Sequence, residues 1–190
     1  MARSKEFEVN EVLDKAIQLF WTQGYEKTSM NELVSFMGIH RRSIYDTFGD
    51  KHALFMKALE RYGAKQANRM KLHLETQRPV KALIRELLES ALTNEGEPLG
   101  CFLVNSGVEL GVLDEEVASL VNGSYDYMEK LLMNVVIKGQ QSGELKTDFE
   151  PEAVSQYLMN AWRGLRTLVK TTTDQQKLNH IFDMTMSVLD

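Results

Sequence analysis

The chain is poor in the residues that mark disulfide-bonded, β-rich or membrane-spanning proteins. Its 190 residues include one cysteine and three prolines. The single cysteine, Cys101, cannot form an internal disulfide, which fits a reducing compartment. The sequence has no run of about 18 uncharged apolar residues, the length that a transmembrane helix needs. The first residues lack the apolar segment of a secretory signal, so we expect a cytoplasmic protein that does not contact membranes.

Patterns of common catalytic and metal sites are also missing. The four histidines, at positions 40, 52, 73 and 180, do not have the spacing of a metal-binding cluster. There is no glycine-rich phosphate loop and no nucleophile elbow. The acidic pair Glu115-Glu116 is interpreted as a solvated helix start and not as paired catalytic acids. We therefore expect no metal, no cofactor and no enzymatic activity.

The negative charge is unevenly distributed. Up to Tyr62, nine basic residues balance nine acidic ones, whereas the remainder has 13 basic and 18 acidic residues and carries the whole net charge of −5. A polyanion would therefore meet a neutral amino-terminal part and an acidic remainder. This distribution excludes a generic basic coat, but it leaves a local contact with nucleic acid open.

Helical periodicity dominates the rest of the chain. Apolar residues recur at spacings of three and four, for example from Val9 to Phe20, and no strand-like alternation is present. A capping box at Ser29 and Glu32, and a proline or aspartate before other apolar stripes, mark helix starts. The expected helices cover about 9–23, 29–38, 40–48, 50–74, 79–91, 99–110, 114–141, 151–171 and 174–190. The sequence predicts an all-α fold of about nine helices.

One segment, residues 28–48 ("TSMNELVSFMGIHRRSIYDTF"), combines two short helices with a glycine between them. Such helices can cross steeply when the turn residue, Gly38, tolerates positive φ. Leu33, Met37, Ile39 and Ile44 are placed to form a small core beneath the crossing. The second helix then exposes adjacent arginines, Arg41 and Arg42, which suit guanine or phosphate in a major groove. Glycine-centred turns with surface arginines also occur in proteins that do not bind DNA, so both interpretations remain open at this point.

A longer string resembles a known family. Residues 12–55, "VLDKAIQLFWTQGYEKTSMNELVSFMGIHRRSIYDTFGDKHALF", closely resemble the amino-terminal domain of the tetracycline-repressor (TetR) family. The shared positions are Ala16, Phe20, Gly24, Tyr25, Thr28, Gly38, Ile39, Ser43, Ile44, Tyr45, Phe48, Lys51, Leu54 and Phe55. The remainder resembles AcrR-type members loosely, through "GCFLVNSGVELG" and "GELKTDFEPEAV".

The resemblance implies an architecture and a function. A three-helix DNA-binding domain with a helix-turn-helix is expected over residues 1–52, joined to a larger helical domain for effector binding and dimerisation over 53–190. The protein would be a ligand-responsive repressor that binds a palindromic double-stranded DNA operator as a homodimer. A small hydrophobic effector would release it.

The resemblance also implies roles for single residues. In the family, the residue that matches Thr28 contacts phosphate at the start of the second helix, and the residue that matches Lys51 contacts phosphate at the fourth helix. Residues implied to enter the groove or grip its backbone are His40, Arg41, Arg42, Ser43 and Tyr45. Arg3 and Lys5 are candidates for an arm in the minor groove. Val34 stands where a small alanine normally lets the two helices approach, so we expect a slightly wider crossing. Arg42 stands where a small residue is frequent, so operator preference cannot be inferred from relatives.

Apolar stripes on the last two helices are candidates for a dimer interface. The residues concerned are Leu158, Trp162, Leu165, Val169, Ile181, Phe182 and Val188. Two such helices from each chain would form a four-helix bundle about a twofold axis. The alternative is that the stripes face the chain's own core.

The effector site is expected among methionines and aromatic residues of the larger domain. The candidates are Met70, Cys101, Phe102, Asn105, Tyr125, Met128, Met159 and Trp162. Methionine at helical spacing is more often core than pocket. Cys101 permits a thiol-sensing repressor as a second hypothesis, but the nearest cations in sequence, Arg85 and Lys130, are distant, which favours an inert packed thiol. A third hypothesis is a helical ligand-binding or interaction module that no longer binds DNA.

Overall fold

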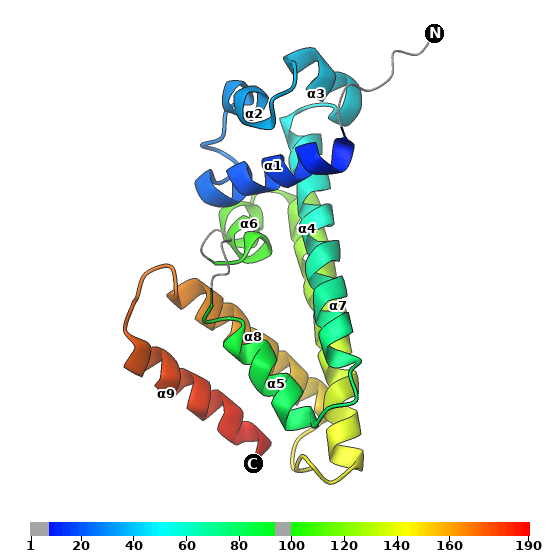
Figure 1. The fold of residues 1–190 in the computed structure, drawn as a ribbon, viewed down its shortest axis with the longest axis vertical. Helices are drawn as coiled ribbons and strands as arrows, with labels where there is room; N and C mark the ends of the chain where they lie inside the picture. The colour runs from blue at the N-terminus through cyan, green and yellow to red at the C-terminus, as the bar shows by residue number, and fades with distance from the viewer. Residues whose placement is uncertain (1–7, 94–99) are drawn as a thin grey trace. The chain divides into compact units, whose positions relative to one another are not determined.

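A computed structural model describes residues 8–93 and 100–190 of the chain (Figure 1). These residues form nine α-helices and one short 3₁₀ helix, and no strand occurs among them. The helices are α1 (Val9–Gln23), α2 (Met30–Met37), α3 (Arg41–Phe48), α4 (Lys51–Leu74), α5 (Val80–Glu89), α6 (Phe102–Leu110), α7 (Glu115–Gln141), α8 (Pro151–Leu168) and α9 (Gln175–Met186), followed by η1 (Ser187–Leu189). The prediction of an all-α fold is confirmed. In the part of the chain that the structure covers, none of the helices has the length and apolarity to cross a bilayer.

Several predicted helix ends depart from the structure by a few residues. Pro79 precedes the first turn of α5 and does not belong to it, since the helix starts at Val80. α8 ends at Leu168, before the expected end near residue 171, because residues 169–171 form a turn. Residue 99, the expected start of the sixth helix, lies outside the described residues, and α6 begins at Phe102. That helix is also less buried than predicted, because Val108 is 84% exposed.

Local hydrogen bonds explain why the helices start where they do. The Ser29 hydroxyl accepts from the amide of Glu32 at 3.2 Å, and the Glu32 carboxylate accepts from the amide of Ser29 at 2.8 Å. This reciprocal pair is the predicted capping box, and it satisfies amides that have no partner within α2. The Ser29 hydroxyl, which donates to the Glu32 carboxylate at 2.6 Å, and then the Ser29 amide lower the pKa of the Glu32 carboxyl. Asp50 and Asp174 accept from the amides of Ala53 and Lys177 at 2.8 and 3.0 Å, which caps α4 and α9 as expected.

The contacts divide the chain into two compact units. Unit 1 contains the residues up to Ala64 together with 102–121, and unit 2 contains 65–101 together with 122–190. The helix-turn-helix therefore packs with α6 and with the first residues of α7, which lie far along the chain. Unit 1 is larger than the 1–52 domain expected from the sequence, because this later segment belongs to its core.

Aromatic side chains form the centre of unit 1. Phe55 meets Phe20 at 5.1 Å and Phe102 at 5.7 Å between ring centroids, both edge to face. Tyr62 meets Trp21 at 5.0 Å and Phe102 at 5.6 Å, also edge to face. Such arrangements place ring edges on the negative faces of neighbouring rings. Phe102 thus fixes α6 to α1 and α4, and it is 1% exposed.

A carboxylate from α6 holds the turn between α1 and α2. Glu109 accepts hydrogen bonds from the amides of Tyr25 and Glu26, each at 2.9 Å. The preceding residue, Gly24, has a φ of +87° and lies so close that a Cβ there would be 2.9 Å from the Glu109 carboxylate. The positive φ favours glycine at this position, whereas the contact with the end of the Glu109 side chain could be relieved by a shift of that side chain. The entry to the helix-turn-helix is therefore bonded directly to α6.

The start of α7 is anchored to α4 in the same unit. The Asp114 carboxylate accepts from the amides of Glu116 and Val117 at 3.0 and 3.1 Å, which caps α7. Its other oxygen lies 2.7 Å from Nε2 of His52. The Val117 amide bond and then the His52 contact lower the pKa of the Asp114 carboxyl.

In unit 2, α5, α8 and α9 pack around a second core (Figure 1). Ala91, Leu165 and Leu178 are almost completely buried at its centre. The Glu144 carboxylate accepts from the amides of Val80 and Lys81, each at 2.8 Å, and so caps α5 from the segment between α7 and α8. This contact repeats the way in which Glu109 bonds two consecutive amides in unit 1.

We expect Glu109→Gln to destabilise the protein by about 1–2 kcal/mol, because the amide nitrogen cannot accept and one backbone amide loses its partner. Urea unfolding measures the change. Glu115→Gln, on the exposed first turn of α7, is the control for the loss of one negative charge. Equal unfolding free energies for wild type and Glu109→Gln would contradict this role.

A second prediction concerns pH. A carboxyl whose pKa is lowered on folding adds stability above its unfolded pKa of about 4, and that stability is lost as the pH falls through the folded pKa. Asp114→Asn keeps a side chain that can cap α7 but removes the titrating group. We expect the variant to be less stable by about 1 kcal/mol at pH 7. The difference should shrink below pH 4 in urea unfolding between pH 7 and pH 3, and a constant difference would contradict the assignment.

Candidate nucleic-acid interface and effector region

The helix-turn-helix has the geometry that the sequence predicts. Gly38 adopts left-handed φ and ψ values of 72° and 27° between α2 and α3. Of the expected inner residues, Leu33 and Ile44 are 0% and Met37 is 1% exposed, whereas Ile39 is only half-buried. Lys15 of α1 donates to the carbonyl oxygen of Met37 at 3.3 Å and so supports the end of α2. The two helices therefore share a rigid base.

The outer side of α3 is polar and accessible. His40, Arg41 and Tyr45 are exposed, Ser43 is half-buried, and the side chain of Arg42 is 93% exposed. Arginine side chains on such a helix can form paired hydrogen bonds with guanine or with phosphate. α3 thus presents the adjacent arginines as expected.

Only weak contacts hold these arginines in the free protein. Nη1 of Arg41 lies 3.4 Å from Oδ1 of Asn31 in α2, and its guanidinium carbon is 5.9 Å from the Tyr45 ring centroid. Nε of Arg42 lies 3.5 Å from the Asp46 carboxylate. Exposed pairs of this kind contribute about 1 kcal/mol or less. Both guanidinium groups can therefore exchange their partners for a nucleic acid at small cost.

Lys51 lies at the first residue of α4, where a helix start favours anions. Its ammonium is 4.2 Å from the ring centroid of Tyr25. Burial, together with Glu26, Asp50 and Asp114, raises the pKa of Tyr25. The ring therefore remains a neutral phenol beneath the lysine over the physiological pH range.

Thr28 differs from the other candidates. It is 0% exposed, and its hydroxyl donates to the carbonyl oxygen of Gly24 at 2.6 Å. Its amide donates to the carbonyl oxygen of Tyr25 at 3.2 Å. This geometry leaves no exposed donor on Thr28 for the phosphate contact that the resemblance implies, and the residue instead stabilises the turn. Arg3 and Lys5, the candidate arm, lie outside the described residues.

Two exposed residues of α2 were not predicted to belong to the candidate interface. Asn31 contacts Arg41, and Phe36, which was grouped with the apolar residues of α2, is 47% exposed. Both lie on the outer side of α2. The sequence signal for them was their offset from the buried Leu33 and Met37 along the helix.

The candidate dimer residues fall into two groups. Leu158 and Leu165 are completely buried within the single chain, and Phe182 is 6% exposed. Trp162, Val169, Ile181 and Val188 are partly exposed. The first group fills the chain's own core, so only the second group retains area for a partner to cover.

The effector candidates are divided between the two units. Met70, Cys101, Tyr125, Met128, Met159 and Trp162 belong to unit 2, whereas Phe102 and Asn105 belong to unit 1. The three methionines are between 2% and 6% exposed. Nε1 of Trp162 donates to the Ser90 hydroxyl at 3.1 Å, and the ring packs in the α5–α8–α9 core. Phe102 belongs to the aromatic core of unit 1 and has no free surface for a ligand.

A charged cluster between α7 and α8 was missed from the sequence. Nη1 of Arg163 lies 2.8 Å from the Glu129 carboxylate, and their side chains are only 16% and 19% exposed. The Arg163 guanidinium carbon is 3.9 Å from the Tyr125 ring centroid. Burial, and then the neighbouring Cys101, raise the pKa of Tyr125 to about 12. The spacing of four from Met159 to Arg163, and from Tyr125 to Glu129, was the signal that these charges face inward.

The surroundings of Cys101 correct one argument made from the sequence. The thiol is 4% exposed, as expected for a packed residue. A cation of α8, however, contacts the backbone of the neighbouring residue. Arg166 donates to the carbonyl oxygens of Thr93, at 2.8 Å, and of Gly100, the residue next to Cys101. Sequence distance was therefore a poor measure of the charge around this thiol.

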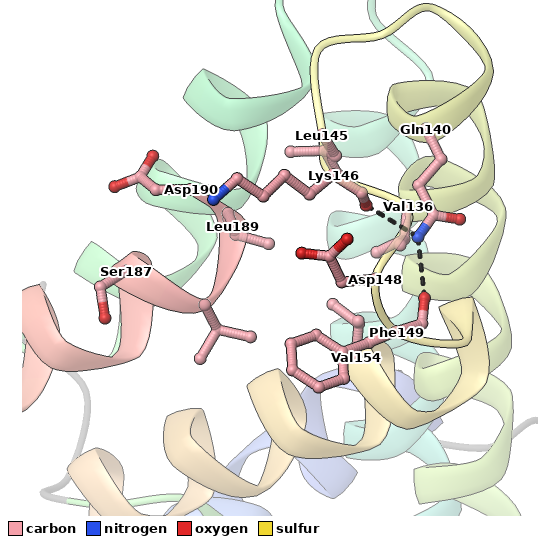
Figure 2. A pocket seen from close by; sticks show the side chains of 11 residues that line it. Val136, Gln140, Leu145, Lys146, Asp148, Phe149, Val154, Ser187, Leu189 and Asp190 are labelled. Atoms are coloured by element: carbon pink, nitrogen blue, oxygen red, sulfur yellow. Dashed lines mark hydrogen bonds between the residues drawn. The ribbon is translucent and has the colours of Figure 1, made fainter.

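Figure 2 shows a separate hollow of about 130 Å³ in unit 2. It lies among the end of α7, the segment from 145 to 149, the start of α8 and η1. Gln140 spans one wall by donating to the carbonyl oxygens of Lys146 and Phe149 at 3.0 and 2.9 Å. Of the candidate residues named above, Val188 lines this hollow. Within the described ranges, no group of three or more histidine, cysteine or acidic side chains is arranged to hold a metal ion.

A helix-turn-helix with an exposed arginine pair, in an all-helical chain with a second helical unit, defines a DNA-binding transcriptional regulator. Comparisons with known proteins agree. A family model described as bacterial regulatory proteins, tetR family, matches residues 12–58, and the model of the tetracyclin repressor-like C-terminal domain matches residues 77–185. The second match alone covers more than half of the chain.

The chain belongs to the TetR family of transcriptional regulators. An uncharacterised HTH-type transcriptional regulator of Bacillus subtilis, YezE, is 32% identical over 194 residues, which covers 100% of both chains. The HTH-type transcriptional repressor ComR of Escherichia coli is 26% identical and covers 97% of this chain and 90% of its own length. A cysteine mutant of the TetR family regulator CifR, solved with a 26-bp operator duplex, has the same fold, with a TM-score of 0.83, 23% identity and 100% coverage of both chains. The predicted class, a ligand-responsive DNA-binding regulator, is confirmed.

We expect Asp46→Asn to strengthen binding to any DNA duplex about threefold at low salt, because the carboxylate beside Arg42 repels phosphate and competes for the guanidinium. Fluorescence anisotropy with a labelled duplex measures the change. The gain should vanish at high salt as exposed charges are screened. Asp183→Asn in α9 is the control for net charge, and an equal gain in both variants would show that Asp46 has no local effect.

Proposed function

We propose that the protein is a repressor that binds a palindromic operator as a homodimer and is released by a small effector. The observation that carries this proposal is the exposed arginine pair on α3 above a buried, glycine-hinged base. The printed names of ComR, and of DhaR from a Mycobacterium strain, describe them as repressors. CifR was solved with operator DNA. These relatives support repression as the direction of regulation and operator DNA as the partner.

In this proposal residues 1–52 are the DNA-binding domain and residues 53–190 bind the effector and form the dimer. His40, Arg41, Arg42, Ser43 and Tyr45 contact the groove or its backbone, and Lys51 contacts a phosphate at the start of α4. A protein with these contacts acts in the cytoplasm. Thr28 is left out of the contact set because both of its donors are used within the turn.

Dimerisation through α8 and α9 follows from their partly exposed apolar residues. Trp162, Val169, Ile181 and Val188 are the side chains that a partner would cover, and the exposed Tyr157 and Met184, at 45% and 69%, extend this surface. A twofold axis repeats α3 at two half-sites, which is the reason that operators are palindromic.

Two helices provide a route for coupling. α4 contributes residues 51–64 to unit 1 and 65–74 to unit 2, and α7 contributes 115–121 and 122–141 in the same way. An effector that binds unit 2 better in one arrangement of these helices shifts the population of the DNA-binding state.

The proposal is tested by measuring binding to the DNA upstream of the protein's own gene. Affinity should fall steeply between about 50 and 200 mM salt, since a protein that makes several phosphate contacts releases counterions. A helical module that no longer binds DNA would show no salt-dependent shift with any fragment. That result would overturn the proposal that the protein is a repressor.

Two substitutions separate base contacts from phosphate contacts. Arg41→Ala should relax sequence preference and weaken the operator complex by about 1–3 kcal/mol, whereas Lys51→Ala should weaken operator and random duplex alike and reduce the salt slope by about one. Lys138→Ala, an exposed lysine of α7, is the matched control. Unchanged operator affinity in both of the first two variants would refute the contact assignment.

A further inference from the structure

The buried guanidinium of Arg163 has donors that the fold does not use. Nε and Nη2 are both buried, and neither has a hydrogen-bond partner among the described residues. Only Nη1 is bonded, to the Glu129 carboxylate at 2.8 Å. Buried donors are almost always satisfied in folded proteins. An ion pair that only joins α7 to α8 does not need buried donors without partners. The two unbonded donors of Arg163 therefore require another explanation.

The two unused donors share one edge of the planar guanidinium. The N–H groups of Nε and Nη2 point the same way, and their separation matches the two oxygens of a carboxylate. The group is also held in orientation, since its carbon lies 3.9 Å from the Tyr125 ring centroid and its third nitrogen is bonded to Glu129. The free edge is therefore a preorganised fork that lacks an acceptor.

The surrounding charges favour an anion. Arg166, one turn further along α8, is 5% exposed and donates to two carbonyl oxygens, so it adds a second positive charge to the region. Glu129 is the carboxylate paired with Arg163. Tyr125 remains neutral, because its pKa is raised to about 12.

Apolar side chains accompany this edge. Met159 precedes Arg163 by four residues on α8, and Met128 precedes Glu129 directly on α7, so both lie on the inner sides of their helices. They are 2% and 6% exposed. Methionine side chains adapt their shape to apolar ligands. α7 and α8 thus carry buried, adaptable apolar side chains in addition to the anion-binding edge.

We propose that the effector is a monocarboxylic acid with an apolar body, whose carboxylate pairs side-on with Nε and Nη2 of Arg163. This inference rests on the proposed function, since it specifies the ligand of the effector region in unit 2. Glu129 holds the guanidinium in place when the effector is absent. The hydrophobic effector expected from the sequence therefore gains an obligatory anionic group.

The test compares acids with their neutral amides. Octanoate, octanamide, benzoate and benzamide are titrated into the full-length protein by isothermal calorimetry, with thermal unfolding in parallel. At least one acid should bind, and its amide should bind at least tenfold more weakly, because an amide offers one acceptor and no charge. Failure of both acids to bind at millimolar concentration, or equal affinity of acid and amide, overturns the proposal.

Two variants test the fork and its internal partner. Arg163→Lys keeps the charge but loses the paired donors, and it should weaken the acid at least tenfold. Glu129→Gln still accepts from Nη1 but removes the competing negative charge, so it should strengthen the acid about tenfold. A merely structural pair predicts the opposite sign for Glu129→Gln, so weaker binding in this variant overturns the proposal. Arg78→Lys, in the exposed pair of Arg78 with Glu86, is the matched control and should change nothing.

Operator binding, measured with the same ligands, separates this inference from the proposed function. An acid that binds through Arg163 but leaves operator affinity unchanged supports the inference and refutes release by this effector. If the amides but not the acids release the operator, the proposed repressor function is supported and the inference about the carboxylate is overturned. A protein without operator affinity refutes the proposed function, while the calorimetric comparison still decides the carboxylate site.

Discussion

Glu109 bonds two consecutive amides in the turn that leads into α2, and the helix-turn-helix depends on this contact. Backbone amides in a turn lack the partners that a helix supplies, so the chain must provide an acceptor from elsewhere. Here the partner comes from α6, some eighty residues later in the sequence. Gly24, the residue before these amides, has a φ of +87°, which favours glycine at this position. The DNA-binding part is therefore completed by a segment that is not contiguous with it.

The same chemistry recurs where α5 begins, since Glu144 bonds the amides of Val80 and Lys81. In both units a carboxylate accepts from two consecutive backbone amides and fixes a distant segment. At α5 it also supplies the cap that Pro79 cannot give, whereas α2 has its own cap in Ser29. Such contacts are strong because a charged acceptor meets two donors at once. They explain how a chain with few prolines and no disulfide keeps its helices in defined positions within each unit.

Membership of the TetR family and the arrangement of buried charge bear on different aspects of regulation. The exposed arginines of α3 use weak partners and can exchange them for DNA, whereas Arg163 is buried with its free edge turned toward the interior. The first group suits a rapid electrostatic encounter and the second suits selective recognition of a small ligand. α4 and α7, which contribute to both units, connect the two functions through continuous helices.

Local sequence determined most of the fold, because helix periods, the Ser29–Glu32 box and the aspartate caps act between residues a few positions apart. The glycine hinge and the exposed side of α3 were predicted for the same reason. What the tertiary structure decided concerns residues that meet across long sequence distances: Glu109 with the α1–α2 turn, Phe102 with the aromatic core, and Arg163 with Glu129 and Tyr125. Burial of a charge depends on which helices pack around it, so the spacing of Arg163 from Met159 could not show by itself that the guanidinium is buried. The partial exposure of Val169 and Ile181 was undetermined for the same reason.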